Sequence, residues 1–395
     1  MKGFLAAMLA GAALWALPVD TAPAEGAEGF LFGDETKGAT ITANEADANI
    51  RIRMQPRLDY GEIIKSADGK TYEKDSDLYF RRARLEITGH LLAKTLKYAL
   101  IISGDKWEKT GNANEVLVQN AYVEWFADDA YNIIFGKEKL PYSRVSLTSS
   151  SKLLFIERPA STEAAKKLFG ETEAYFQPKL GVRGRLFEDV LAYEAALADG
   201  WSNGEEIYSG YDIQAAAPLY ALRLELSPKG WAEEKKSETH LGKGRHLTAG
   251  LNYANQGSIE YKGNAYSEKR SLIGFDLSGH YNGITGQFEY NQWSIDSEDS
   301  AISDKKPRGW YVQAGYFIEP YNIEPALRHE VYDQDSNSDD KTETNSTAGV
   351  NWYLKGQSLK LGLNWVHTEY DAQASGALTG DTQKDAYQAQ AQMYF

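Results

Sequence analysis

The chain has 395 residues, among them 25 Tyr, 9 Trp and no Cys, and its formal net charge at pH 7 is −14. Without Cys, it cannot form disulfides, thiolate metal sites or covalent haem attachments. So negative a charge argues against a nucleic-acid-binding protein, which needs a basic surface. The many Tyr and Trp residues suit the aromatic girdles that membrane proteins place at the bilayer interfaces.

The first residues have the form of a secretory signal peptide. Lys2 supplies a positive charge, Phe4–Leu17 is a short apolar run, and small residues up to Ala24 form a cleavage site. The apolar run is too short to cross a bilayer as a helix, which takes about 20 apolar residues. We therefore expect a signal peptide over residues 1–24, with Ala27 as an alternative cleavage point.

Strands are expected along most of the remaining chain. Residues 25–48 are predicted to be a periplasmic N-terminal segment, and from Asn49 onward apolar and polar residues alternate with the period of β-strands. About 16 strands are predicted, joined alternately by short turns and long loops. Outer-membrane barrels show this alternation because their periplasmic turns are short and their extracellular loops are long. The sequence predicts an all-β fold, a transmembrane antiparallel β-barrel over residues 49–395.

The alternation assigns one face of each strand to lipid and the other to the lumen. An Arg or Lys on the lipid face at midplane costs about 2–4 kcal/mol, so a register that turns basic residues inward is preferred. Arg81 falls on the opposite face and is expected near the outer rim. The predicted pore-lining, anion-binding residues are Arg51, Arg53, Arg57, Arg82, Arg84, Lys97, Arg183 and Arg185.

These basic residues allow two interpretations. Guanidinium groups bind oxyanions bidentately, so a lumen lined by them would attract anions. Inward-facing carboxylates such as Asp59, Glu86 and Glu124 leave open that each Arg pairs across strands and only stiffens the wall. The arginines of the first two strands favour anion attraction, because only Asp59 and Glu86 lie near them.

Two connections are unusually long for their positions. Leu140–Gln177 is the longest and is a candidate to fold into the barrel and narrow the pore. Within it, Lys152, Glu157 and Arg158 are the predicted constriction residues. Ser227–Lys243 lies where a short periplasmic turn is expected. It is either an elaborated turn or a sign that the strand count is wrong there.

The final strand, Ala386–Phe395, shows the barrel pattern most clearly. One of its faces carries Tyr387, Ala389, Ala391, Met393 and Phe395. The opposite face carries Gln388, Gln390, Gln392 and Tyr394. One apolar face and one amide-rich face fit a wall with lipid outside and water inside.

A series of motifs between Tyr79 and Val182 points to a known family. They are FRRARLEITGHL at 80–91, LKYAL at 96–100, QNAYVEW at 119–125, FGKEKLPYS at 135–143, LTSSSKLLFIERP at 147–159 and LGV at 180–182. In order and spacing they resemble the phosphate-selective porin family, porins O and P. The resemblance implies an outer-membrane barrel of about 16 strands, commonly trimeric. It also implies a third loop folded into the pore and passive diffusion of anions past an arginine-lined wall.

No enzyme activity, cofactor or metal site is predicted. The six His residues show no metal-ligand spacing, and no His is placed to activate the serines at 149–151. The acidic runs Asp296–Asp304 and Asp333–Glu343 are expected to be solvated outer loops, bridged to lipopolysaccharide by divalent cations.

The leading hypothesis is a porin of the bacterial outer membrane for small solutes, with a preference for phosphate or other oxyanions. Its expected partners are outer-membrane lipid, lipopolysaccharide, small anionic solutes and further copies of the chain in a homotrimer. The alternative is a barrel scaffold that sheaths a partner protein such as a multihaem cytochrome in electron transfer. Glu28–Ala48 and the long periplasmic turn would then be docking sites.

Overall fold

The computed structural model describes residues 30–32, 38–66, 71–74, 76–170, 175–208, 211–263, 267–298, 303–372, 374 and 382–395. The predicted signal peptide lies outside these residues. Within them, most regular structure is β-strand, as the alternating pattern predicts. No helix in the described ranges is long and apolar enough to cross a membrane.

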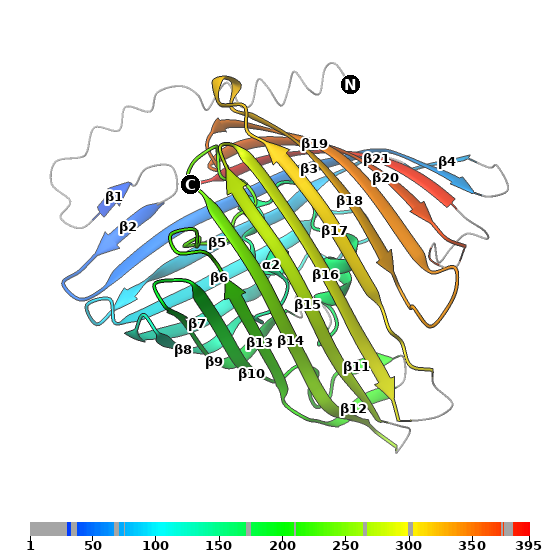
Figure 1. Cartoon of the computed structure of the whole chain (residues 1–395), viewed down its shortest axis with the longest axis horizontal. Helices are drawn as coiled ribbons and strands as arrows, with labels where there is room; N and C mark the ends of the chain where they lie inside the picture. The colour runs from blue at the N-terminus through cyan, green and yellow to red at the C-terminus, as the bar shows by residue number, and fades with distance from the viewer. Residues whose placement is uncertain are drawn as a thin grey trace.

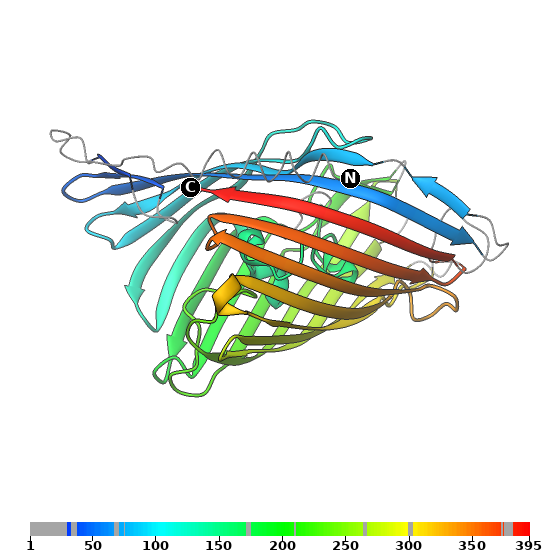
Figure 2. The same cartoon turned by 90° about the horizontal axis from the view of Figure 1, so that it is seen from above.

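Antiparallel strands form a closed barrel of 16 wall strands (Figures 1 and 2), which confirms the predicted fold class. They are β3 (Asp47–Ser66), β5 (Asp77–Leu91), β6 (Leu96–Trp107), β7 (Leu117–Asp128), β8 (Tyr131–Lys139), β9 (Phe176–Leu186), β10 (Leu191–Ala198), β12 (Tyr211–Ala216) with β13 (Leu219–Leu226), β14 (His246–Tyr261), β15 (Ser267–Tyr281), β16 (Ile284–Ser297), β17 (Arg308–Tyr316), β18 (Ile323–Asp333), β19 (Thr342–Lys355), β20 (Leu359–Tyr370) and β21 (Thr382–Tyr394).

Two details of the pairing complete the wall. β12 and β13 both pair with β14 and count as one strand, interrupted at Pro218, whose nitrogen cannot donate a hydrogen bond. The last strand pairs with the first, and Gln388 lies opposite Asp59. This pairing closes the barrel, so the first and last wall strands are not open edges.

Four short strands extend the sheet at its ends: β1 (Phe30–Phe32), β2 (Ala39–Thr42), β4 (Thr71–Lys74) and β11 (Glu206–Tyr208). β2 pairs with β3, with Ala39 opposite Ile50, close to the point where the chain ends. The amide of Phe395 donates to the carbonyl of Ile52 at 3.1 Å. Part of the predicted N-terminal segment therefore continues the sheet where β21 stops.

Exposure alternates along the wall strands in the order expected for a membrane barrel. On β15, Phe275 and Leu277 are about half exposed, whereas Asp276 and Ser278, which alternate with them, are buried. The same alternation runs along β14, β16 and β17. Apolar side chains therefore cover the outside and polar side chains the inside, the reverse of a soluble fold.

The connection after β8 packs inside the barrel. Its described part, residues 140–170, is called the inner loop below and contains α2 (Arg144–Leu147), η1 (Ser150–Lys152) and α3 (Ala160–Ala165). Both cartoon views place these helical turns within the ring of strands (Figures 1 and 2). Leu140, Tyr142 and Phe169 form a buried apolar cluster with Leu272 and Trp293 of the wall.

The long connection between β13 and β14, residues 227–245, also folds inward and is called the inner turn below. The amide of Glu238 donates to the carbonyl of Lys152 at 3.0 Å. In return, the amide of Leu154 donates to Glu238 Oε2 at 2.9 Å. Gln357 Nε2 of the β19–β20 connection donates to Thr239 Oγ1 at 2.6 Å. The strand count is therefore sound, and this connection is an elaborated periplasmic turn that meets the inner loop inside the lumen.

Candidate functional site: the arginine side of the lumen

A β-bulge places two consecutive arginines inside the barrel. The register of β3 against β5 pairs Gln55 with Arg82 and Pro56 with Phe80, which leaves Arg81 as the extra residue. A bulge of this kind redirects side chains, and Pro56 suits the position because it lacks a backbone donor. Arg81 and Arg82 are both buried. Arg81 therefore faces the lumen, and the prediction that it falls on the lipid face is wrong.

Glu157 of the inner loop pairs with two wall arginines, Arg81 of β5 and Arg57 of β3. Its carboxylate accepts from Arg81 Nε at 2.5 Å and Arg81 Nη2 at 3.1 Å, and it also pairs with Arg57. Arg57 pairs in addition with Asp59 at 2.7 Å. Burial by itself would raise the pKa of the Glu157 carboxyl, but Arg81 and Arg57 outweigh it and hold that pKa well below its usual range. Glu157 therefore stays ionised and ties the inner loop to the wall.

A second carboxylate, Asp105 on β6, is shared by the neighbouring arginines. Arg84 binds it bidentately, with Nε to Oδ1 at 3.1 Å and Nη2 to Oδ2 at 2.6 Å. Arg81 and Arg82 approach the same carboxylate at 3.7 Å and 3.9 Å. Arg82 also donates to Gln55 Oε1 at 3.0 Å. One negative charge therefore lies among three positive ones.

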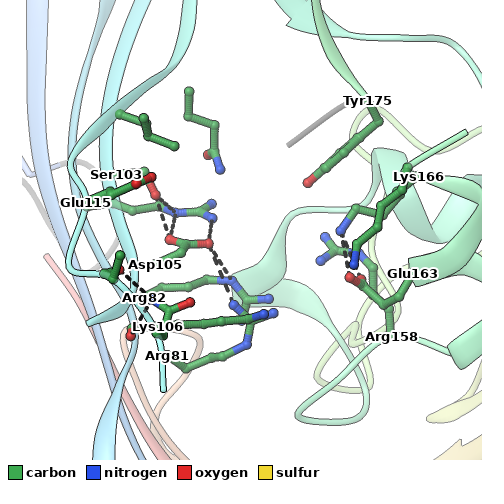
Figure 3. Close-up of a pocket in the computed structure, with 16 residues that line it drawn as sticks. Arg81, Arg82, Ser103, Asp105, Lys106, Glu115, Arg158, Glu163, Lys166 and Tyr175 are labelled. Atoms are coloured by element: carbon green, nitrogen blue, oxygen red, sulfur yellow. Dashed lines mark hydrogen bonds and ion pairs between the residues drawn. The ribbon is translucent and has the colours of Figure 1, made fainter. Parts of the chain in front are cut away.

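These side chains border a cavity of about 330 Å³ between the wall and the inner loop. Figure 3 shows Arg81, Arg82 and Asp105 on the wall side, facing Lys166 and other loop residues across an open space. The charged residues that line the cavity are Arg81, Arg82, Arg84, Lys106, Arg158, Lys166 and Lys167, which are basic, and Asp105, Glu115 and Glu163, which are acidic. The lining has a formal excess of four positive charges.

Comparison with protein families identifies the barrel. The family model described as "Phosphate-selective porin O and P" matches residues 50–395. The chain belongs to this family. It is a porin, a channel of the bacterial outer membrane, and its family and fold are those of a channel rather than an enzyme.

Relatives and solved structures agree with this assignment. An uncharacterized protein of Aquifex aeolicus (strain VF5) is 34% identical over 93% of this chain and 92% of the relative. Porin O of Pseudomonas aeruginosa is 23% identical over 100% of this chain and 98% of the relative.

Two solved porin-like barrels share the fold. The anion-selective porin from Comamonas acidovorans has a TM-score of 0.59 at 15% identity and covers 89% of this chain and 100% of its own. The outer-membrane channel DcaP of Acinetobacter baumannii has a TM-score of 0.61 at 13% identity and covers 90% of this chain and 99% of its own. At such identities the likeness concerns the fold.

The other predicted lumen residues of the porin lie away from the cavity. Arg51 and Arg53 pair with Glu86 at 3.4 Å and 2.5 Å, and Arg53 Nη1 also donates to Ser150 Oγ of the inner loop at 2.8 Å. Lys97 lies 3.3 Å from Glu124. All three cations therefore pair with carboxylates of neighbouring wall strands, and Arg53 also binds the inner loop.

The two arginines of β9 also have partners. Arg183 binds Glu124 bidentately at 2.7 Å and 2.6 Å. Arg185 lies 3.7 Å from Asp189 and donates to the carbonyl of Glu233 at 2.8 Å. The structure thus places Arg82 and Arg84 in the cavity lining and Arg57 beside Glu157, whereas the other five predicted wall residues pair with Glu86, Glu124 or Asp189.

The predicted constriction residues of the inner loop have different environments. Glu157 lies between Arg57 and Arg81. Arg158 borders the cavity, but its guanidinium donates to the carbonyls of Val145 and Thr148, both at 2.9 Å, and so braces the loop. Lys152 is not among the residues that line the cavity. Its backbone carbonyl accepts from the inner turn.

Seven of the charged residues that line the cavity were not predicted from the sequence: Arg81, Asp105, Lys106, Glu115, Glu163, Lys166 and Lys167. The proline at position 56 is a signal that could have placed Arg81, because proline inside a strand marks an edge or a bulge. The Lys166–Lys167 pair sits within the loop already predicted to fold inward. Asp105 and Lys106 fall just beyond the predicted end of their strand, in a segment assigned to an outer loop.

Proposed function

We propose that this porin is a diffusion channel that prefers small anions, with phosphate and other oxyanions as its solute class. The observation that carries the proposal is the cavity lining, in which seven basic side chains face three acidic ones. The narrow space between the wall and the inner loop is the proposed constriction of the pore.

The charge excess gives the preference a physical cause. A water-filled passage between low-dielectric walls concentrates ions of the sign opposite to its lining. Asp105 lies 2.6 Å from Arg84 but 3.9 Å from Arg82, so one carboxylate neutralises the arginine cluster only in part. Guanidinium groups then offer planar, bidentate donors that match phosphate oxygens.

Known relatives support the same direction. The Comamonas acidovorans porin, which shares the fold, is described as anion-selective, and the matching family is described as phosphate-selective. These descriptions concern those proteins, and the cavity lining of this chain supplies the independent reason to extend them.

Ion selectivity in planar bilayers tests the proposal. The purified porin is inserted into a bilayer with a KCl gradient, and a reversal potential that shows chloride preference is expected. The double variant Arg82→Gln/Arg84→Gln removes two charges from the lining and should shift the reversal potential toward cations. Arg183→Gln is the matched control, because Arg183 pairs with Glu124 outside the cavity lining and should cause a smaller shift.

Two outcomes would contradict the proposal. If the wild-type protein forms no conducting channel, it is not a diffusion channel. A double variant whose reversal potential equals that of the wild type would show that these arginines only stabilise the wall. Added phosphate should reduce chloride conductance in the wild type more than in the double variant, which separates oxyanion binding from general anion attraction.

Assembly and partners form a separate part of the proposal. We expect a homotrimer in outer-membrane lipid, with lipopolysaccharide at the acidic outer loops. A solved form of OmpT from Vibrio cholerae with the same fold, at a TM-score of 0.55 and 11% identity, is described as a trimer. Sedimentation of the detergent-solubilised porin tests this expectation. For the alternative cytochrome sheath, the inner turn is a weak docking site because its central residues pack into the lumen.

A further inference from the structure

Three imidazoles and a carboxylate meet at the periplasmic end of the barrel. His246 begins β14 and lies directly opposite His280 on β15. His240 of the inner turn lies against both, with ring centroids 4.7 Å from His246 and 4.3 Å from His280. Glu233, also in the inner turn, completes the group. Two wall strands and one inward-folded turn therefore bring these side chains together.

The geometry is close to that of a metal site. One potential ligand atom from each of Glu233, His240 and His246 lies within 4.8 Å of the others. In a tetrahedral zinc site with bonds of about 2.1 Å, the ligand atoms are roughly 3.4 Å apart. Small side-chain rotations would close the difference, since Glu233 and His240 both lie on a turn rather than on a strand.

The imidazoles of His246 and His240 contain buried ring nitrogens that make no hydrogen bonds to the described residues. His246 is 3% exposed, and neither of its ring nitrogens has a hydrogen-bond partner among the described residues. Nε2 of His240 is likewise buried without a partner in the described part of the chain. A buried polar group without a partner costs about 1–3 kcal/mol, so such groups call for an explanation. A cation bound to these nitrogens would supply the missing interaction.

Neighbouring groups hold the Glu233 carboxylate in a position from which it could bind a metal. One carboxylate oxygen pairs with Arg144 of α2, and the other accepts from the amide of Ser237 at 3.2 Å. Each oxygen keeps a second lone pair, so both contacts can persist when the carboxylate binds a metal. Arg144 Nη2 also donates to the carbonyl of Ser237 at 3.3 Å. Such outer contacts orient a ligand and fix its position.

We propose that Glu233, His240 and His246 form a binding site for a divalent transition metal, with Zn²⁺ as the best match. Two imidazole nitrogens and one carboxylate favour zinc and its neighbours over Mg²⁺ and Ca²⁺, which prefer oxygen ligands. The fourth position is open to water or to His280. Because Glu233 and His240 belong to the inner turn and His246 to the wall, the ion would clamp the turn in place. Arg144 connects the same site to the inner loop.

Titration calorimetry on the full-length porin, purified in detergent and stripped with a chelator, tests the site. One Zn²⁺ per chain is expected to bind in the micromolar range or tighter, with no heat from Mg²⁺. His240→Ala and His246→Ala should each weaken Zn²⁺ binding by more than about tenfold. His329→Ala is the control, because His329 is exposed and contacts Ser346 instead. X-ray absorption at the zinc edge should show imidazole ligands at about 2.0–2.1 Å.

Several results would overturn the proposal. They are a wild-type chain that binds no Zn²⁺, a His240→Ala variant that binds as tightly as the wild type, or an absorption spectrum without imidazole scattering. His240 lies on a turn, so its variant is expected to fold even if the His246 variant does not, and heat-modifiable gel mobility checks folding for both. Bilayer selectivity plays no part in these measurements, so their outcome is independent of the anion proposal.

Discussion

Strands β3, β5 and β6 and strands β14 to β19 both turn polar side chains into the lumen, yet these side chains have different surroundings. On the first side, Arg82 and Arg84 border a cavity. On the other side, Glu289 accepts from Ser143 Oγ at 2.5 Å and from the amide of Val145 at 3.2 Å. The inner loop covers the second wall and leaves the cavity beside the first.

The difference shows that one alternating pattern can serve two purposes. A polar side chain that the inner loop covers must be satisfied by hydrogen bonds, and Glu330, which accepts from the amide of Ala160 at 2.7 Å, behaves in this way. A polar side chain beside the cavity can instead meet solutes and water. The position of the loop, rather than the strand pattern, decides which wall faces the solute.

The largest effect is expected from cutting the contact between the inner loop and the arginine wall. Glu157→Ala leaves Arg57 and Arg81 without their shared carboxylate. Removal of one partner from a buried ion pair costs about 3–5 kcal/mol, and the lower end applies because a quarter of the Glu157 side chain is exposed. Urea unfolding of the barrel in lipid vesicles, followed by Trp fluorescence, measures the loss. Glu319→Ala is the control, since Glu319 is exposed in a short connection. Equal stability of the two variants would show that Glu157 does not hold the loop.

A smaller effect is expected from acid. The pKa of Glu157 is lower in the folded protein than its usual value of 4.5. Its contribution is therefore complete above that value and is lost as pH falls through the lower, folded pKa. Unfolding midpoints should thus drop as the pH falls below about 4.5 in the wild type, and the Glu157→Gln variant should drop less. Parallel curves for the two proteins would assign the acid sensitivity to other groups.

The smallest effect is expected on the covered wall. Glu289→Gln keeps one carbonyl acceptor for the inner loop but loses the second carboxylate oxygen and the charge. The expected loss of stability is about 1 kcal/mol, the worth of a single hydrogen bond. Bilayer selectivity should stay unchanged, because Glu289 lies under the loop and does not line the cavity. A selectivity shift as large as that of the arginine double variant would show that solute reaches both walls.

Much of the barrel could be predicted from local pattern. A period of two specifies which face of each strand meets lipid, and the alternation of connection lengths orients the barrel, so the wall strands and the fold class follow directly. The motifs between Tyr79 and Val182 led to the family that the chain belongs to. These features depend only on residues that are close together in the sequence. A strand in the wrong register would turn charged side chains toward lipid at a high energetic cost.

The site depends on contacts between distant segments. Arg81 turns inward because a bulge opposite Pro56 breaks the alternation. Arg57 and Glu157 are 100 residues apart. His240 and His246 show no ligand spacing in the sequence, and they meet Glu233 only because the inner turn folds back into the barrel.

The sequence by itself determined the wall, its two faces and the presence of basic residues in the lumen. Only the tertiary structure decided which of those residues pair, which are covered and which border the cavity. The physical reason is that a strand's face is set by the local period of its backbone and by the cost of charge in lipid. A charged side chain's partner is set by whichever loop packs against it, and that packing involves the whole barrel.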